Sequence, residues 1–113
     1  MTLQDWIAKY EKKAERFNIP PGFLLDYVPH KGFMVWRISG RVLEIYHTCT
    51  NDFAYWHNKA YEAAREMGCI KIRTNTSRDP VAYMRKSKGK IRVDLSHAKD
   101  GRFYWVFEQE VLY

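Results

Sequence analysis

This sequence has no long apolar run and few cysteines. No window of about 18 consecutive apolar residues occurs, so we predict no transmembrane helix. Residues 1–17 carry charges throughout, unlike the apolar segment of a secretory signal. Cys49 and Cys69 are the only cysteines, and they form neither a CxxC pair nor another zinc-binding spacing. We therefore expect a cytoplasmic protein with reduced, buried thiols, no disulfide framework and no metal site.

The composition is rich in apolar and aromatic residues. Hydrophobic residues make up 46% of the 113 positions and aromatic residues 16%, which is enough for the core of one domain in a chain too short for two. The chain has 19 basic and 13 acidic residues, which gives a formal net charge of +6. This basic protein could therefore attract a phosphorylated ligand or a polyanion such as nucleic acid, or its charges could simply form a solvated surface.

Hydrophobic periodicity divides the chain into helices and strands. Apolar residues recur at helical spacing from Leu3 to Phe17, and Thr2 is a suitable N-cap. Short turn signals separate three strands, and a strand–helix–strand unit follows, which usually joins parallel strands through a right-handed crossover. We expect helices at residues 2–17, 53–67 and 80–87, and strands at 23–28, 33–38, 41–48, 69–73, 90–95 and 102–109. The predicted fold class is α+β, with a mixed, mostly antiparallel sheet, one parallel strand pair and flanking helices.

Three segments match a known arrangement of elements. RVLEIYHTCT (41–50) resembles a central strand, FAYWHNKAYEAAREMGCIKIRTNT (53–76) a pyrophosphate-binding helix and a diverging strand, and RDPVAYMRKSKG (78–89) a closing helix. In this order they resemble the GNAT superfamily of acetyl-CoA-dependent N-acetyltransferases, over about four-fifths of the chain. The resemblance implies one GNAT-like domain over residues 1–113, with acetyl-CoA and an amine acceptor as substrates. Short versions of this superfamily are often phage- or prophage-borne, so the resemblance also implies a phage protein.

Thr50, Asn51, Asp52 and Phe53 stand where the family has its glycine-containing cofactor loop, so the resemblance makes them cofactor-binding positions. In the family, glycine lets backbone N–H groups approach the pyrophosphate closely at the start of a helix. This chain has no glycine there, and the carboxylate of Asp52 would itself occupy the positive end of the helix dipole. The sequence therefore predicts a degenerate pyrophosphate loop.

Glu44 and Tyr83 are the candidate catalytic residues. The resemblance implies that an acidic residue on the central strands deprotonates the amine, which fits Glu44; alternatively, Glu44 pairs with Arg37 or Arg41 across the hairpin. It also implies a tyrosine acid near the closing helix, which points to Tyr83. However, counting four residues back from the glycine that ends this helix gives Arg85, and the ring of Tyr83 could instead pack on the sheet.

Asn75, Arg78 and Arg85 are further cofactor-binding candidates, because the resemblance places cofactor and acceptor near the end of the diverging strand. Two histidines, His47 and His57, could approach one another across the junction of strand and helix. Their spacing, even with a cysteine nearby, requires neither a metal site nor a cysteine nucleophile.

Two functions other than acyl transfer remain open. A chain that has lost cofactor binding would be a GNAT-shaped binding or assembly module for a protein partner, and a bare aromatic face could join two copies in a homodimer. A basic cluster could instead bind RNA or DNA, or form a solvated surface, as charge runs usually do. This basic cluster comprises Lys71, Arg73, Arg78, Arg85, Lys86, Lys88, Lys90 and Arg92.

Overall fold

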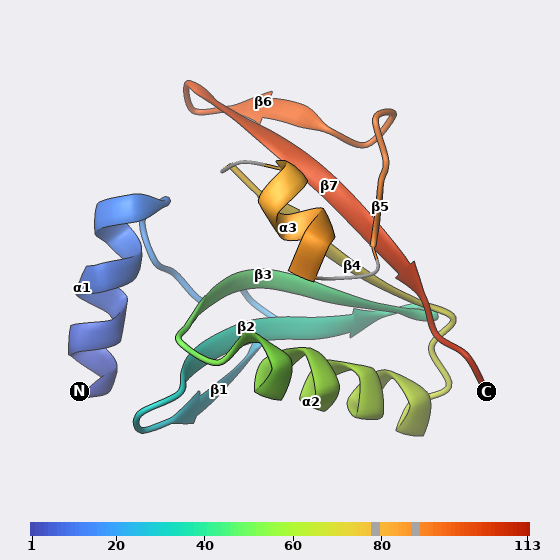
Figure 1. Cartoon of the computed structure of the whole chain (residues 1–113), viewed down its shortest axis with the longest axis horizontal. Coiled ribbons are helices and arrows are strands. Elements are labelled where there is room, and N and C mark those ends of the chain that lie inside the picture. The colour runs from blue at the N-terminus through green and yellow to red at the C-terminus, as the bar shows by residue number, and fades with distance from the viewer. Residues whose placement is uncertain (78–79, 87–88) are drawn as a thin grey trace.

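The computed structural model describes residues 1–77, 80–86 and 89–113, with every side chain in these ranges except those of Tyr83 and Lys86. Three helices surround a seven-stranded sheet in this part of the chain (Figure 1). The strand order is β1-β2-β3-β4-β7-β5, and β6 pairs with β7. The strands are β1 (Leu24–Val28), β2 (Gly32–Ser39), β3 (Val42–Thr50), β4 (Lys71–Thr76), β5 (Lys90–Ile91), β6 (His97–Lys99) and β7 (Arg102–Glu110). The helices are α1 (Leu3–Lys13), α2 (Phe53–Glu66) and α3 (Pro80–Lys86).

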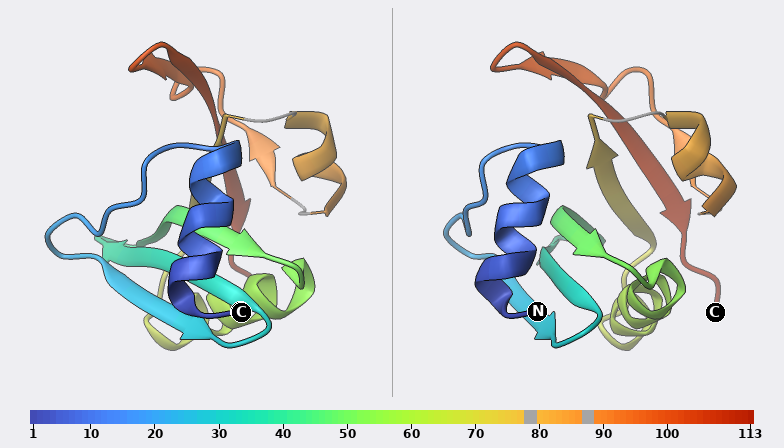
Figure 2. Two further views of the ribbon diagram at one scale, coloured as in Figure 1. Left: turned by 90° about the vertical axis from the view of Figure 1, so that its left-hand side faces the viewer. Right: turned by 60° about the vertical axis from the view of Figure 1, so that its left-hand side comes forward.

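β3 and β4 form the parallel pair that the strand–helix–strand pattern predicts, with α2 as the crossover between them. Their pairing runs from Val42 opposite Lys71 to Ile45 opposite Thr74. Both strands continue beyond this pairing and diverge, as the right-hand view of Figure 2 shows. The other strand pairs of the described residues are antiparallel. The predicted α+β class with one parallel pair is therefore confirmed.

β3 contains one extra residue opposite β2. Val35 of β2 faces His47, and the next residue, Trp36, faces Ile45, so Tyr46 has no counterpart. Such a β-bulge breaks the alternation of side chains along the strand. The rings of Tyr46 and His47 are accordingly in edge contact, with their centroids 4.3 Å apart.

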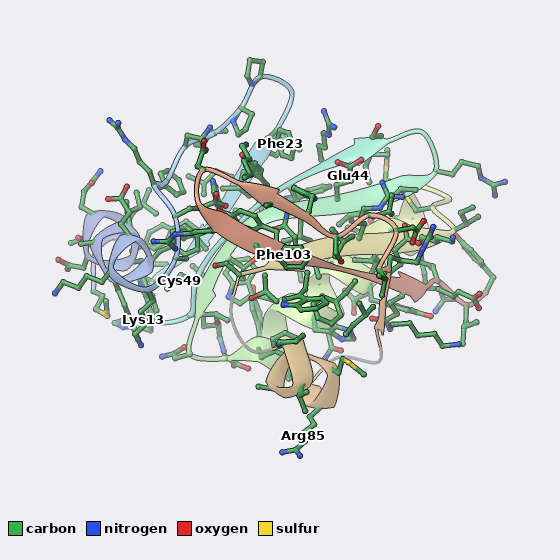
Figure 3. All side chains as sticks on the ribbon, turned by 90° about the horizontal axis from the view of Figure 1, so that it is seen from above. Lys13, Phe23, Glu44, Cys49, Arg85 and Phe103 are labelled. Atoms are coloured by element: carbon green, nitrogen blue, oxygen red, sulfur yellow. The ribbon has the colours of Figure 1, made fainter. Side chains whose placement is uncertain are left out.

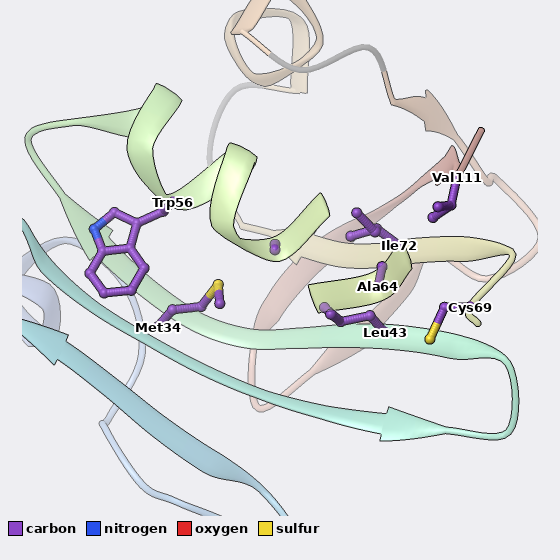
Figure 4. Close-up of a cluster of buried hydrophobic side chains, with 8 residues drawn as sticks. Met34, Leu43, Trp56, Ala64, Cys69, Ile72 and Val111 are labelled. Carbon is purple, nitrogen blue, oxygen red and sulfur yellow. The ribbon is translucent and has the colours of Figure 1, made fainter. Parts of the chain in front are cut away.

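The sheet is covered on both faces near β3. On one face, α2 places Trp56 in a buried cluster with Met34 and Leu43 of the sheet (Figure 4). On the other face, α1 packs Tyr10 edge to face against Phe33. This double coverage explains the nearly continuous apolar character of β3. No helix of the described residues is both long and apolar enough to cross a membrane.

α1 begins as predicted and ends early. Thr2 forms a capping box with Asp5, whose backbone N–H donates to the Thr2 hydroxyl at 3.2 Å. The helix ends at Lys13 rather than at residue 17, because Ala14 leaves helical geometry with φ −130° and ψ −134°. The chain then bends so that Phe17 packs its ring against the sheet. Tertiary packing therefore overrides the helical periodicity of residues 14–17.

The segment after β5 also differs from the sequence prediction. The strand predicted at 90–95 ends at Ile91, because the following residues form a turn with two N–H groups donating to the Arg92 carbonyl. β6, which no periodicity predicted, is short and exposed. It forms because Asp100 and Gly101 adopt φ of +52° and +78°, as the tight hairpin to β7 requires.

Candidate functional site

The divergence of β3 from β4 opens a cavity of about 650 Å³, which we call the large cavity. Its walls come from the three helices and from β2, β3, β4 and β7. Figure 3 labels two of its lining residues, Lys13 of α1 and Cys49 of β3. The large cavity therefore reaches from the sheet interior to the molecular surface between the helices.

A second cavity, of about 490 Å³, lies against the β6–β7 hairpin, and we call it the small cavity. Phe23 and Glu44 line it, and in Figure 3 they lie across the hairpin from Lys13 and Cys49. The two cavities meet where the parallel strands part. They share a set of lining residues, which we call the junction: Glu15, Ile45, Tyr46, Thr74, Asn75 and Tyr104.

The N-terminus of α2 borders the large cavity and is closed by its own side chains. Asp52 Oδ1 accepts a hydrogen bond from the Tyr55 N–H at 3.2 Å, and Asp52 Oδ2 lies 2.7 Å from Lys31 Nζ. Two hydrogen bonds lower the pKa of Asp52: the one from Lys31 has the larger effect, and the one from the Tyr55 backbone N–H has the smaller. An ionised carboxylate thus occupies the helix N-terminus, where the sequence predicted one. Three of the four predicted loop residues line the large cavity: Thr50, Asn51 and Phe53.

The other predicted cofactor residues fall in different places. Asn75 belongs to the junction. Arg85 lies on α3, lines neither cavity and projects away from the sheet in Figure 3. Arg78 and the side chain of Tyr83 lie outside the described residues. The structure thus brings Asn75, but not Arg85, to the point where the cavities meet.

Glu44 lines the small cavity and is held by two arginines. Its carboxylate lies 3.2 Å from Nη2 of Arg37 and 3.9 Å from Nη1 of Arg73. Its side chain remains 24% exposed, so the largely buried carboxylate considered from the sequence is only half-buried. The predicted pairing across the β2–β3 hairpin is therefore present, with Arg37.

Part of the basic cluster is neutralised by one buried carboxylate. Glu108 of β7 accepts a hydrogen bond from Arg73 Nε at 2.8 Å, pairs with Arg92, and lies 3.4 Å from Lys71 Nζ. Burial alone would raise the pKa of Glu108, but the hydrogen bonds from Arg73 and Arg92 outweigh it and lower the pKa. These three cations therefore belong to an internal ion cluster. The side chains of Arg78, Lys86 and Lys88 lie outside the described residues.

A hydrogen-bonded network joins the junction to the space beneath α1. Tyr104 donates to Glu15 Oε2 at 2.8 Å, and Glu15 Oε1 lies 3.3 Å from His47 Nδ1. His47 also contacts the Tyr10 hydroxyl at 2.6 Å through Nδ1 and Asn18 Oδ1 at 2.9 Å through Nε2. Burial lowers the pKa of His47. In the neutral ring, Nε2–H donates to Asn18 and Nδ1 accepts from Tyr10.

Sequence reasoning missed this network. A helix extending to residue 17 would place Glu15 on the solvent face, so only the early end of α1 brings it to the junction. The two histidines do not meet, because His47 lies beneath α1 whereas His57 Nε2 bonds Gln109 Oε1 at 2.7 Å on the α2 side. Among the residues that the structure describes, no group of three or more His, Cys, Asp or Glu side chains is placed to hold a metal ion.

Known proteins resemble this chain in structure and not in sequence. No protein-family model matches the sequence, and no curated protein sequence matches it significantly. Ard1 from Thermoplasma volcanium matches with a TM-score of 0.64 and 14% identity, over 100% of this chain and 95% of its own. The ribosomal-protein-S18-alanine N-acetyltransferase from Escherichia coli matches with a TM-score of 0.58 and 11% identity, over 100% of this chain and 92% of its own.

A third similar structure was solved with a ligand. The Bacillus subtilis acetyltransferase, in complex with CoA, matches with a TM-score of 0.57 and 14% identity, over 96% of this chain and 84% of its own. At such identities the similarity shows a shared fold. Acetyltransferases thus recur among proteins built on this arrangement of strands and helices.

Proposed function

We propose that this chain, which has the fold of the GNAT acyl-CoA N-acyltransferases, transfers an acyl group from acyl-CoA to an amine. The observation that carries the proposal is the meeting of two cavities at the junction. Transfer between two substrates requires that their reacting atoms be held together while each enters by its own route. The large cavity would admit acyl-CoA, and the small cavity would admit the amine.

The large cavity suits the pantetheine arm of acyl-CoA. Beyond Ile45, β3 has left its pairing with β4, so its edge from Tyr46 to Thr50 faces the gap. An extended ligand with amide groups can add to such an edge through main-chain hydrogen bonds. Bound in this way, acyl-CoA would present its thioester carbonyl at the junction, next to Asn75.

The diphosphate of acyl-CoA needs positive groups other than a glycine loop. Asp52 already caps α2, although Lys31 offsets its charge. Lys9 and Lys13, one helical turn apart on α1, line the large cavity. Among the described residues, neither has a carboxylate within ion-pairing distance. These two lysines would therefore attract the diphosphate.

We propose roles for the remaining residues that the family resemblance singled out. Glu44, for which the resemblance implied the role of base, would instead attract and orient the ammonium group of the acceptor in the small cavity, because two arginines already hold its carboxylate. Tyr83 remains the proposed acid for the departing thiolate, since a phenol can supply that proton. Arg78 and Arg85 remain proposed cofactor-binding residues. We also retain the cytoplasm as the proposed compartment.

The capped N-terminus of α2 favours a second candidate function. A helix N-terminus that is already capped by an ionised Asp52 attracts a phosphate less strongly than an uncapped N-terminus does. A GNAT-shaped binding or assembly module without CoA would tolerate such a cap. Its partner would then occupy the same cavities or the surface around them.

Isothermal titration with acetyl-CoA and with CoA decides between the two candidates. We expect binding, followed by release of the CoA thiol when a primary amine is added. Absence of both heat and thermal stabilisation at millimolar ligand would remove the enzyme and favour the binding module. A salt-dependent gel shift with mixed RNA and DNA would show whether the remaining basic surface holds nucleic acid.

A further inference from the structure

Glu15 occupies the point where the two cavities meet. It lies just beyond α1 and lines both the large and the small cavity. Its side chain is 23% exposed, so it is accessible to a ligand and yet partly shielded from water. A carboxylate in this position can contact an acceptor amine as it reaches the thioester.

A neutral phenol holds Glu15 in place. Tyr104 donates to Oε2 at 2.8 Å, whereas the unprotonated Nδ1 of neutral His47, 3.3 Å from Oε1, gives it no hydrogen bond. Burial and the hydrogen bond to Glu15 raise the pKa of Tyr104 to about 12, so the phenol keeps its proton at neutral pH and remains a donor. Glu15 is thus oriented without losing its net negative charge.

The other two carboxylates that line the cavities are neutralised. Glu44 faces two guanidinium groups, and Glu108 is bound by three cationic side chains. Each of these two carboxylates already has a cationic partner. Within the described ranges, Glu15 alone of the three has no lysine or arginine within 4.0 Å. It is therefore the cavity carboxylate whose charge no lysine or arginine offsets.

We propose, on the basis of the acyl transfer proposed above, that Glu15 is the catalytic residue that deprotonates the acceptor. Glu15 accepts one proton from the ammonium group of a primary amine and leaves a neutral nitrogen with a free electron pair. This pair forms the C–N bond to the thioester carbonyl carbon, while the C–S bond breaks and its electron pair stays on sulfur. Sulfur takes a proton from the proposed acid Tyr83, and the second proton leaving nitrogen restores that phenol, which gives the amide and the CoA thiol; Glu15 returns its proton to water. Tyr104 acts as a positioning residue.

Substitutions at the cavity carboxylates test this role. CoA thiol release from acetyl-CoA is measured with a panel of primary amines: a diamine, an aminoglycoside and a peptide with a free N-terminus. We expect Glu15→Gln to lower kcat by about 100-fold or more, as loss of a general base does, with the Kd for acetyl-CoA unchanged by calorimetry. Glu44→Gln should mainly raise the KM for the amine. Glu62→Gln, at an exposed position on α2, is the matched control.

Two further variants test the role of Glu15 even if Glu15→Gln fails to fold. Tyr104→Phe removes only the hydrogen bond to Glu15 and should lower kcat by about tenfold, the effect expected of one lost hydrogen bond. If Glu15→Gln unfolds, Glu15→Asp keeps the charge and shifts the carboxylate, and should lower kcat without changing the KM for acetyl-CoA.

The outcomes separate this role from acyl transfer itself. A wild-type protein that turns over, together with a Glu15→Gln variant within threefold of its kcat, would overturn the role of Glu15 and leave acyl transfer standing. A wild-type protein that binds no acetyl-CoA, or that binds it and acylates no amine, would remove acyl transfer and the role of Glu15 with it.

Discussion

Gly32 lies directly against the backbone of the neighbouring strand, unlike the glycines at 22, 40, 68 and 101. Its φ is +105°, and a Cβ atom at this position would lie 1.9 Å from the carbonyl oxygen of Cys49 on the neighbouring strand. That oxygen belongs to the backbone of β3, which pairs with β2 along this segment. Only glycine therefore fits at the start of β2 without displacing the strand that borders the large cavity.

We expect Gly32→Ala to destabilise the protein by about 3 kcal/mol, because backbone strain and a steric clash add together. Gly40→Ala is the matched control, since Gly40 also has a positive φ of +61° but has no atom within 4 Å of the added Cβ. It should cost about 1 kcal/mol. Urea denaturation measures both variants. Equal losses at the two positions would show that the contact with Cys49 contributes nothing.

His47 should make stability depend on pH. Burial, assisted by Lys99 and opposed by Glu15, lowers its pKa below the ordinary value of 6.5. Between the folded and unfolded pKa values the unfolded chain therefore binds more protons, so stability is full above about pH 6.5 and falls as the pH drops below it. Urea denaturation between pH 7.5 and about pH 5 should show a shallower decline for His47→Gln than for the wild type. Identical slopes would contradict this role.

Single-residue roles could be predicted from sequence where they depend on neighbours in the chain. Thr2 and Asp52 were expected near helix starts because caps are local features, and the structure places both there. The partner of Glu44 could be narrowed to Arg37 or Arg41, because a tight hairpin limits the register, and the structure shows Arg37. Glu15 could not, because its position depends on the bend after α1 and on contacts with residues far along the chain.

At the scale of elements, Glu108 ties β4 to β7 and to the turn after β5. Its side chain is buried and bound by Arg73, Arg92 and Lys71. We expect Glu108→Ala to destabilise the protein by about 1–3 kcal/mol, because it removes the buried acceptor of the hydrogen bonds from Arg73 and Arg92. Glu110→Ala, at an exposed position of the same strand, should change stability by less than about 0.5 kcal/mol. Thermal unfolding followed by circular dichroism checks both. A similar loss for the two variants would show that the ion cluster is not what joins these strands.

α1 supplies the cations proposed to bind the diphosphate. We expect the double variant Lys9→Ala, Lys13→Ala to weaken CoA binding by about tenfold, since each partly exposed cation contributes up to about 1 kcal/mol. Pantetheine, which has no diphosphate, should bind the variant and the wild type alike. Lys12→Ala, an exposed cation of the same helix that lines neither cavity, is the control. Calorimetry at two salt concentrations measures the effect, and an unchanged Kd for CoA would place the diphosphate elsewhere.

Elements with strong periodicity were predictable, and weakly patterned ones were not. The apolar spacing of α2 and the apolar sequence of β3 identified both elements, within one or two residues at each end. β6 is three exposed residues without alternation, so only the hairpin turn at Asp100 and Gly101 hinted at it. The end of α1 was missed because residues 14–17 keep a helical pattern although their packing partners lie on the sheet.

At the scale of the molecule, the order of elements was sufficient to predict one parallel pair within an antiparallel sheet. The cavities were not predictable, because their size depends on how far β3 and β4 part and on which side chains remain between them. The β-bulge at Tyr46, a residue that lines both cavities, has no signature in the sequence either.

Ligand binding should protect two distant segments together. Acetyl-CoA in the large cavity would contact residues 46–50 and residues 74–76, which lie on either side of the gap. We expect amide hydrogen exchange to slow in both segments, because local opening becomes less frequent when a ligand is bound. β1, at the edge of the sheet, should not change. Protection of only one segment, or of β1, would contradict binding between the strands.

Four residue pairs join β3 to β4. The sheet thus consists of two halves, β1–β3 and β4–β7, which are joined by this short stretch of parallel pairing between β3 and β4. Four paired residues resist rotation of one half of the sheet against the other less than pairing along the whole of β3 and β4 would. One half can therefore tilt while every strand keeps its partners. We expect such tilting to vary the width of the gap between β3 and β4, so that the large cavity can accept ligands of different thickness.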